Sequence, residues 1–166
     1  MAIPARNASV RQIVAGARTF YVTSSTFEKR FLLQSRRSAA LFIRVLYEYR
    51  AKQKFRLHEF VVMPNHFHVL ITVDGEMSIE RAVQLVKGGF SFRAGTELGL
   101  RSPVWQRGFS ELRILNVVAA ERVRQYIREN PVAGGLAREA SDYPFSSANV
   151  GYVLDPLPEF LNRIRA

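Results

Sequence analysis

Apolar residues recur along this chain with two different spacings, and each spacing predicts its own kind of element. Four segments are rich in aromatic and β-branched residues or alternate apolar with polar ones, as strands do, at residues 19–27, 55–63, 66–73 and 109–115. Three segments repeat apolar residues every three or four positions, as helices do, at residues 37–53, from residue 78 onwards, and at residues 117–130. Only Pro64 and Asn65 separate the middle two strands, so we predict an antiparallel hairpin there.

Three residue patterns predict where the second and third helices begin, break and end. Ser78 precedes an apolar periodic run and is the predicted N-cap of the second helix. Gly88 and Gly89 are expected to interrupt that helix, either as a kink or because the chain approaches a ligand closely. Pro131 is expected to end the third helix, because the residue before a proline is disfavoured in the helical conformation.

The order strand, helix, strand, strand, helix, strand, helix is typical of an α+β domain with a ferredoxin-like, RRM-like antiparallel sheet. We expect the helices to pack on one face of the sheet and to leave the other face open to solvent. The chain then divides into a basic N-terminal arm at residues 1–18, one domain at residues 19–151 and a C-terminal tail at residues 152–166.

A His-x-His pair opens the third predicted strand. Side chains alternate faces along a strand, so His66 and His68 project from the same side, about 7 Å apart. The opposite face takes Phe67 and Val69, which suit a core. Two imidazoles at this spacing can share one divalent cation, but two ligands do not make a site. A metal site and a half-buried structural pair both remain open at this point; the third histidine, His58, is interpreted as structural.

The amino-acid composition limits the kinds of metal site, catalysis and binding partner that this chain can have. The chain has no cysteine, which excludes disulfides, a thiolate nucleophile and sulfur-bound metal sites. Oxygen and imidazole ligands suit Mg²⁺ or Mn²⁺ best, with Zn²⁺ also compatible. Lysine and arginine outnumber the acids by 24 to 14, giving a net charge of +10 that predicts a nucleic-acid partner, although a basic surface without such a partner is the alternative. No apolar run reaches about 20 residues, so we expect no membrane segment, and we expect a cytoplasmic protein.

The third predicted helix adds a second pair of functional groups. Tyr126 and Asn130 are four residues apart, so they are neighbours on one helix face, about 6 Å apart along the axis. Asn130 can offer a carbonyl oxygen to a hard cation, and Tyr126 a phenolic oxygen to a phosphorus atom beside it. The alternatives are an aromatic side chain packed in the core and an asparagine that merely lies near a helix end.

Four motifs, at residues 61–70, 104–109, 126–132 and 142–148, occur in the order and spacing of REP-associated tyrosine transposases. The chain thus resembles a branch of the single-tyrosine HUH transposases. The resemblance implies the HUH endonuclease fold, with His66, His68 and Asn130 as ligands of Mg²⁺ or Mn²⁺. It also implies Tyr126 as the nucleophile that cuts one DNA strand and leaves a 5′-phosphotyrosine. The implied substrates are single-stranded DNA hairpins formed by REP-like palindromes, and the implied assembly is a monomer or a homodimer.

Basic and aromatic residues on or beside these elements are the predicted DNA contacts. They are Lys87, Arg93, Arg107, Arg113, Arg122, Arg128 and Trp105. The alternatives are solvated charges for the arginines and core packing for the aromatic residues, which include Phe90 and Phe92. Rival functions are a catalytically silent hairpin-binding protein of the same fold, an HUH replication initiator or relaxase, and a small metallohydrolase that ignores DNA.

Overall fold

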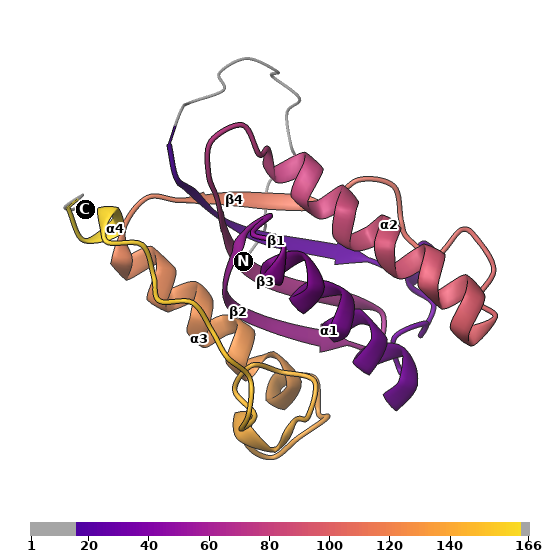
Figure 1. The fold of residues 1–166 in the computed structure, drawn as a ribbon. Coiled ribbons are helices and arrows are strands. Elements are labelled where there is room, and N and C mark those ends of the chain that lie inside the picture. The colour runs from indigo at the N-terminus through magenta and orange to yellow at the C-terminus, as the bar shows by residue number, and fades with distance from the viewer. Residues whose placement is uncertain (1–15, 164–166) are drawn as a thin grey trace.

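The structure, a computed structural model, describes residues 16–163 (Figure 1). Its strands are β1 (Arg18–Ser25), β2 (Arg56–Met63), β3 (His66–Val73) and β4 (Ser110–Ile114). Its helices are α1 (Arg36–Ala51), α2 (Ile79–Leu98), α3 (Val117–Ala133) and the short α4 (Phe160–Arg163). Two single turns of 3-10 helix, η1 (Phe27–Lys29) and η2 (Ala140–Asp142), complete the described elements.

The four strands form one antiparallel sheet in the order β2-β3-β1-β4. Met63 pairs with His66 across the two-residue turn, which confirms the predicted hairpin. The two central strands, β1 and β3, pair along their whole length, from Arg18 opposite Val73 to Ser25 opposite His66. This strand order and the element sequence confirm the predicted α+β, ferredoxin-like fold.

The helices cover both faces of the sheet, so the prediction that one face is open was wrong (Figure 1). One face carries Phe67 and Val69 under α1 and α2. The other carries Tyr21, Val61 and Leu70, which pack against α3. Because both faces of the central strands are apolar, an open face would leave these side chains in water, and α3 removes them from it.

The glycine pair does not interrupt α2, which continues to Leu98. Ser78 caps the helix as predicted, and its hydroxyl accepts the Arg81 backbone N–H at 3.0 Å. A Cβ atom on Gly89 would lie only 3.0 Å from the Tyr49 ring on α1. Gly89 therefore serves a close helix–helix contact, which explains its presence in a helix without any kink.

Pro131 does not end α3, which runs on to Ala133. The proline lies in the last turn, so its missing N–H costs the helix a single bond, and its ring is buried. At the other end, the Asn116 side chain accepts the Ala119 backbone N–H at 2.8 Å. This N-cap fixes where α3 starts and hence which of its faces meets the sheet.

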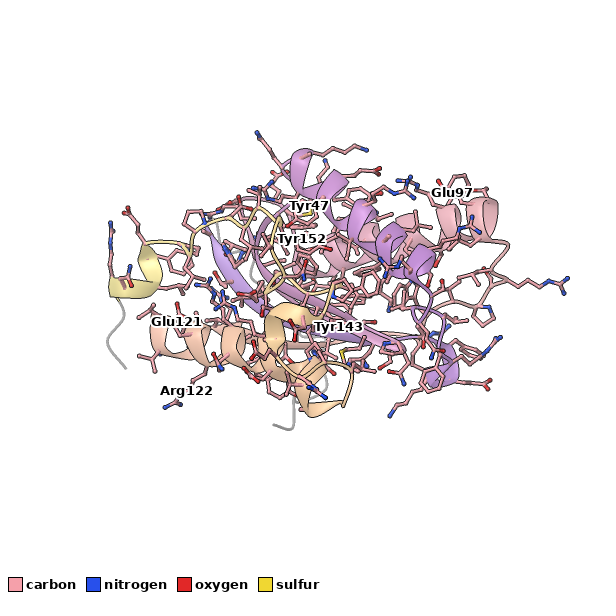
Figure 2. The ribbon with its side chains drawn as sticks, turned by 90° about the horizontal axis from the view of Figure 1, so that it is seen from below. Tyr47, Glu97, Glu121, Arg122, Tyr143 and Tyr152 are labelled. Atoms are coloured by element: carbon pink, nitrogen blue, oxygen red, sulfur yellow. The ribbon has the colours of Figure 1, made fainter. Side chains whose placement is uncertain are left out.

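Residues after α3 fold back along the free edge of β2. The Val62 N–H donates to the Phe145 carbonyl at 2.8 Å. Further on, Tyr152 stacks on Tyr47 of α1 (Figure 2), and the Asp155 carboxylate binds Arg50 at 2.7 Å. This part of the predicted tail thus packs as part of the domain.

Arg18, assigned to the N-terminal arm by sequence, is the first residue of β1, and residues 1–15 of the predicted arm lie outside the described residues. Within residues 16–163, no helix is both long and apolar enough to cross a membrane.

Candidate active site

His66, His68, Tyr126 and Asn130 line one open pocket of about 520 Å³ between the sheet and α3. The histidines come from the start of β3, and the other two residues from one face of α3. A single site that contains all four residues requires these two distant elements to lie side by side, and the structure places them so. The pocket is also lined by Thr23, Ser25, Lys29, Met63, Asn65, Ala133 and Gly134.

His68 is held by its Nδ1 atom, which lies 2.9 Å from the Tyr21 hydroxyl and 2.7 Å from the Thr23 hydroxyl. Its other ring nitrogen, Nε2, is buried and has no hydrogen-bond partner. Burial, and then the charge of neighbouring His66, lower the pKa of His68 to about 3. The imidazole is therefore neutral at physiological pH, and a proton on Nδ1 leaves the Nε2 lone pair free.

His66 is held in a similar way by its sequence neighbour. Its Nδ1 donates to the Asn65 side-chain oxygen at 2.7 Å. Burial lowers the pKa of His66, while a hydrogen bond with the Asn130 side chain raises it and the charge of Lys29 lowers it. The two imidazole rings lie 4.9 Å apart between centroids, close enough for one ion to contact both.

These residues fit a small divalent cation. His68 offers an unpaired buried Nε2, and Asn130 offers an amide group within reach of His66. Buried polar atoms are rarely left without a partner, so the lone Nε2 is suited to accept a ligand. Within residues 16–163, no group of three or more His, Cys, Asp or Glu side chains could hold a metal. Asn130, which lines the same pocket, carries an amide oxygen of the kind that hard cations accept as a third protein ligand.

Tyr126 stands beside the histidines with part of its side chain in solvent. Its ring packs edge-on against His68, with centroids 5.7 Å apart, and against Tyr21 at 6.2 Å. The side chain is 41% exposed, in contrast to its buried neighbours Val123 and Ile127. Tyr126 is therefore accessible to a large substrate, and its position is set by the buried stripe of α3.

A buried carboxylate joins α3 to the sheet. Glu59 of β2 is fully buried, and one of its oxygens accepts bonds of 3.1 Å from both Arg124 and Arg128. Its other oxygen accepts the hydroxyl of Ser147. The sequence analysis missed this cluster, although a lone acid inside the apolar segment 57–63 was a signal of it. Arg128, predicted to contact DNA, is thus already paired.

Three other predicted DNA contacts also have structural roles. The Lys87 ammonium donates to the backbone carbonyls of Gln106 and Gly108 at 3.1 and 2.7 Å, and burial lowers its pKa to about 8. The Trp105 indole donates to the Lys87 carbonyl at 2.9 Å and packs among core aromatic rings. Arg93 pairs with Glu48 and Glu97. None of the three lines the pocket.

The remaining predicted DNA contacts are exposed. Arg122 lies one turn before Tyr126 on α3 and points away from the body of the protein (Figure 2). Arg107 follows Gln106, whose backbone N–H donates to the carbonyl of Ser25 at the pocket. Arg113 lies over the Phe20 ring at 5.5 Å, on the face of the sheet that α1 and α2 cover. DNA contact by these arginines stays a prediction.

The sequence analysis also missed four residues that shape the pocket. Tyr21 and Thr23 orient His68, Asn65 orients His66, and Lys29 lines the pocket wall. Strand alternation could have placed Tyr21 and Thr23 on one face of β1. Their contact with His68 depends on the pairing of β1 with β3, which local sequence does not specify.

Comparison with known proteins shows similarity to transposases, in agreement with the resemblance seen in the sequence motifs. The sequence model of the family described as "Transposase IS200 like" matches residues 19–130. A REP-associated tyrosine transposase of Escherichia coli strain K12 is 26% identical over 137 residues, covering 78% of this chain and 80% of that protein. An uncharacterized protein of Haemophilus influenzae is 33% identical over 98 residues, covering 46% of this chain and 54% of that protein.

The fold has a close match among solved structures. A REP-associated tyrosine transposase bound to a REP hairpin superposes with a TM-score of 0.70 at 21% identity. The match covers 97% of this chain and the whole of the other. The described domain, including its C-terminal segment, therefore has the same fold as that transposase.

Proposed function

Because this chain belongs to the IS200-like transposase family, we propose that it cuts and rejoins single-stranded DNA at hairpin-forming palindromes. One observation carries the proposal at the level of residues. Tyr126 shares a pocket with two neutral histidines and an asparagine, in a protein with a net charge of +10. A partly exposed phenol beside a cation site is suited to attack on a phosphodiester, and the surrounding charge is suited to DNA.

The cutting step is a transesterification. The Tyr126 phenolic oxygen forms a bond to phosphorus while the bond between phosphorus and the 3′ oxygen breaks. The phenolic proton passes to water, and the leaving 3′ oxygen takes a proton from water. The products are a 5′-phosphotyrosine and a 3′-hydroxyl, so the bond energy is kept and rejoining needs no ATP.

His66, His68 and Asn130 are the residues that would hold a divalent ion in this pocket. Bound Mg²⁺ or Mn²⁺ would polarise the phosphate and neutralise charge in the transition state. The protein keeps this ligand set neutral by burying the histidines, and it fixes their orientation through Tyr21, Thr23 and Asn65. Tyr126 is kept in place by the docking of α3 on the sheet.

The proposal is tested by looking for the covalent intermediate. A labelled single-stranded hairpin with flanking sequence is incubated with the protein and Mn²⁺ and separated under denaturing conditions. We expect a labelled protein band that disappears in Tyr126→Phe and remains in Tyr49→Phe, a tyrosine of α1 on the opposite face of the sheet. Tight binding without any adduct, in Mg²⁺ or Mn²⁺, would instead identify a silent hairpin-binding protein.

A further inference from the structure

Lys29 is the only positively charged side chain among the described residues that line the Tyr126 pocket. Aspartate and glutamate are absent from the same set of lining residues. Two cationic residues that were predicted to contact DNA are engaged elsewhere, because Arg128 pairs with Glu59 and Lys87 donates to two backbone carbonyls. A negatively charged group that enters the pocket therefore has Lys29 as the charged residue of the pocket lining.

The backbone presents Lys29 in an unusual conformation. Glu28 and Lys29 have φ angles of 52° and 53°, in the left-handed region that side-chain-bearing residues seldom adopt. The turn is held from both sides, since Phe27 N–H donates to the Val104 carbonyl at 2.9 Å and Lys29 N–H to the Thr26 carbonyl at 3.0 Å. Strain of this kind persists where the surroundings fix it, and it is concentrated at functional sites.

Asn65 ties this turn to the histidines. Its side-chain oxygen accepts the His66 Nδ1 proton at 2.7 Å, while its amide nitrogen donates to the Lys29 carbonyl at 3.4 Å. Its backbone carbonyl accepts the Thr26 N–H at 2.9 Å. The turn and the histidine ring are thus linked through one residue. The backbone of Lys29 is therefore held next to the histidines, and its side chain lines the same pocket.

We propose that the Lys29 ammonium binds the phosphate group that Tyr126 attacks, an inference that rests on the proposed function. The two histidines and the asparagine contribute no charge of their own, and the attacked phosphodiester carries one negative charge that is redistributed in the transition state. A lysine that lines the pocket supplies a positive charge there, and it does so whether or not a metal is bound. Lys29 is then a phosphate-binding residue of the reaction rather than a general DNA contact.

The first experiment measures the rate of adduct formation in a single turnover with saturating hairpin. Lys29→Gln should form the adduct about ten- to a hundredfold more slowly, as expected for loss of a charge-assisted hydrogen bond in the transition state. Lys29→Arg should recover most of the rate. The matched control is Lys52→Gln, which removes the same charge at the far end of α1, outside the pocket. Equal rates for Lys29→Gln, Lys52→Gln and the parent protein would overturn the proposal.

The second experiment uses binding alone and locates the phosphate. In Tyr126→Phe, with EDTA present, the attacked phosphate is replaced by a neutral methylphosphonate. If Lys29 binds that phosphate, Lys29→Gln and the methylphosphonate each weaken binding, but together they weaken it no more than either alone. At a neighbouring phosphate the two effects should multiply. Multiplying effects at the attacked phosphate would contradict the proposal.

Failure of this inference can be told apart from failure of the proposed function. A parent protein that forms no adduct argues against DNA cleavage, yet the methylphosphonate experiment still tests the Lys29 contact in binding. A parent protein that forms the adduct, with a Lys29→Gln variant of equal rate, rejects the Lys29 contact alone. Circular dichroism and melting temperatures of both lysine variants check that the strained turn has not changed the fold.

Discussion

Replacing the buried carboxylate of Glu59 tests how α3, and with it Tyr126, is held on the sheet. Glu59→Gln keeps the size of the side chain but removes its charge. Arg124 and Arg128 then lose the partner that they share at 3.1 Å. Removing one partner of a buried ion pair costs about 3–5 kcal/mol when the other charge stays buried.

The two arginines are 25% and 40% exposed, so water can solvate part of their charge once Glu59 is gone. We therefore expect a smaller loss in the free energy of unfolding, about 2–3 kcal/mol. For a domain of this size, that loss corresponds to a melting temperature about 4–12 °C lower. Arg124→Gln and Arg128→Gln should each cost less, about 0.5–1 kcal/mol, because the remaining arginine still pairs with Glu59.

Urea denaturation of the parent and the three variants measures these differences directly. Well below all melting temperatures, Glu59→Gln should also form the Tyr126 adduct about tenfold more slowly, since α3 is less firmly placed. A loss of unfolding free energy below about 1 kcal/mol would show that Glu59 does not hold α3 on the sheet. So would a Glu59→Gln variant that is no less stable than Arg128→Gln.

Three further predictions concern other parts of the structure. Tyr21→Phe combined with Thr23→Val removes both hydroxyls that orient His68. The double variant should bind Mn²⁺ about 10- to 100-fold more weakly when the affinity is measured by calorimetry, with Tyr49→Phe as the control. An unchanged affinity would argue against this orienting role. Burial lowers the pKa of His58 in the folded state, so its contribution to stability is complete above the unfolded pKa of about 6.5 and is lost as pH falls below it. The fall in melting temperature between pH 7.5 and pH 5.5 should thus be smaller in His58→Gln, and an equal fall would be contrary to expectation. Gly88 has open space around it, so Gly88→Ala should raise the free energy of unfolding by about 0.5–1 kcal/mol. In Gly89→Ala the added methyl group meets the Tyr49 ring, so this variant should gain less stability or lose some. Equal gains in denaturant midpoint would contradict the helix contact.

Local periodicity predicted the parts of the site that lie within one element. The two-residue period of β3 placed His66 and His68 on one face, and the helical period of α3 placed Tyr126 and Asn130 on another. Their meeting in one pocket follows from the packing of α3 on the second face of the sheet, which was expected to be open; the resemblance implied that the four residues act together, but no local pattern placed the helix. The fold class was predictable for the same reason, because the order of elements and the short hairpin leave few alternatives.

Most of the features that were missed depend on contacts between residues far apart in the sequence; the bond of Asn65 to its neighbour His66 is the exception. Glu59 lies 65 and 69 positions from its arginine partners, so no local pattern shows that Arg128 is engaged. The glycine pair predicts a break in α2 from sequence alone, and only the position of Tyr49 beside Gly89 in the fold explains why the helix continues. The sequence does not distinguish the lysines by role, yet Lys87 donates hydrogen bonds to backbone carbonyls while Lys29 lines the pocket.

The proposed cleavage requires that Tyr126 itself becomes joined to DNA. Trypsin cleaves after Arg124 and Arg128, so Tyr126 falls within a peptide of residues 125–128. After reaction with a hairpin substrate and nuclease digestion, mass spectrometry should find this peptide carrying a 5′-phosphonucleotide. Finding the nucleotide on another tyrosine, such as Tyr21, or on no peptide of a protein that binds the hairpin tightly, would rule out Tyr126 as the nucleophile.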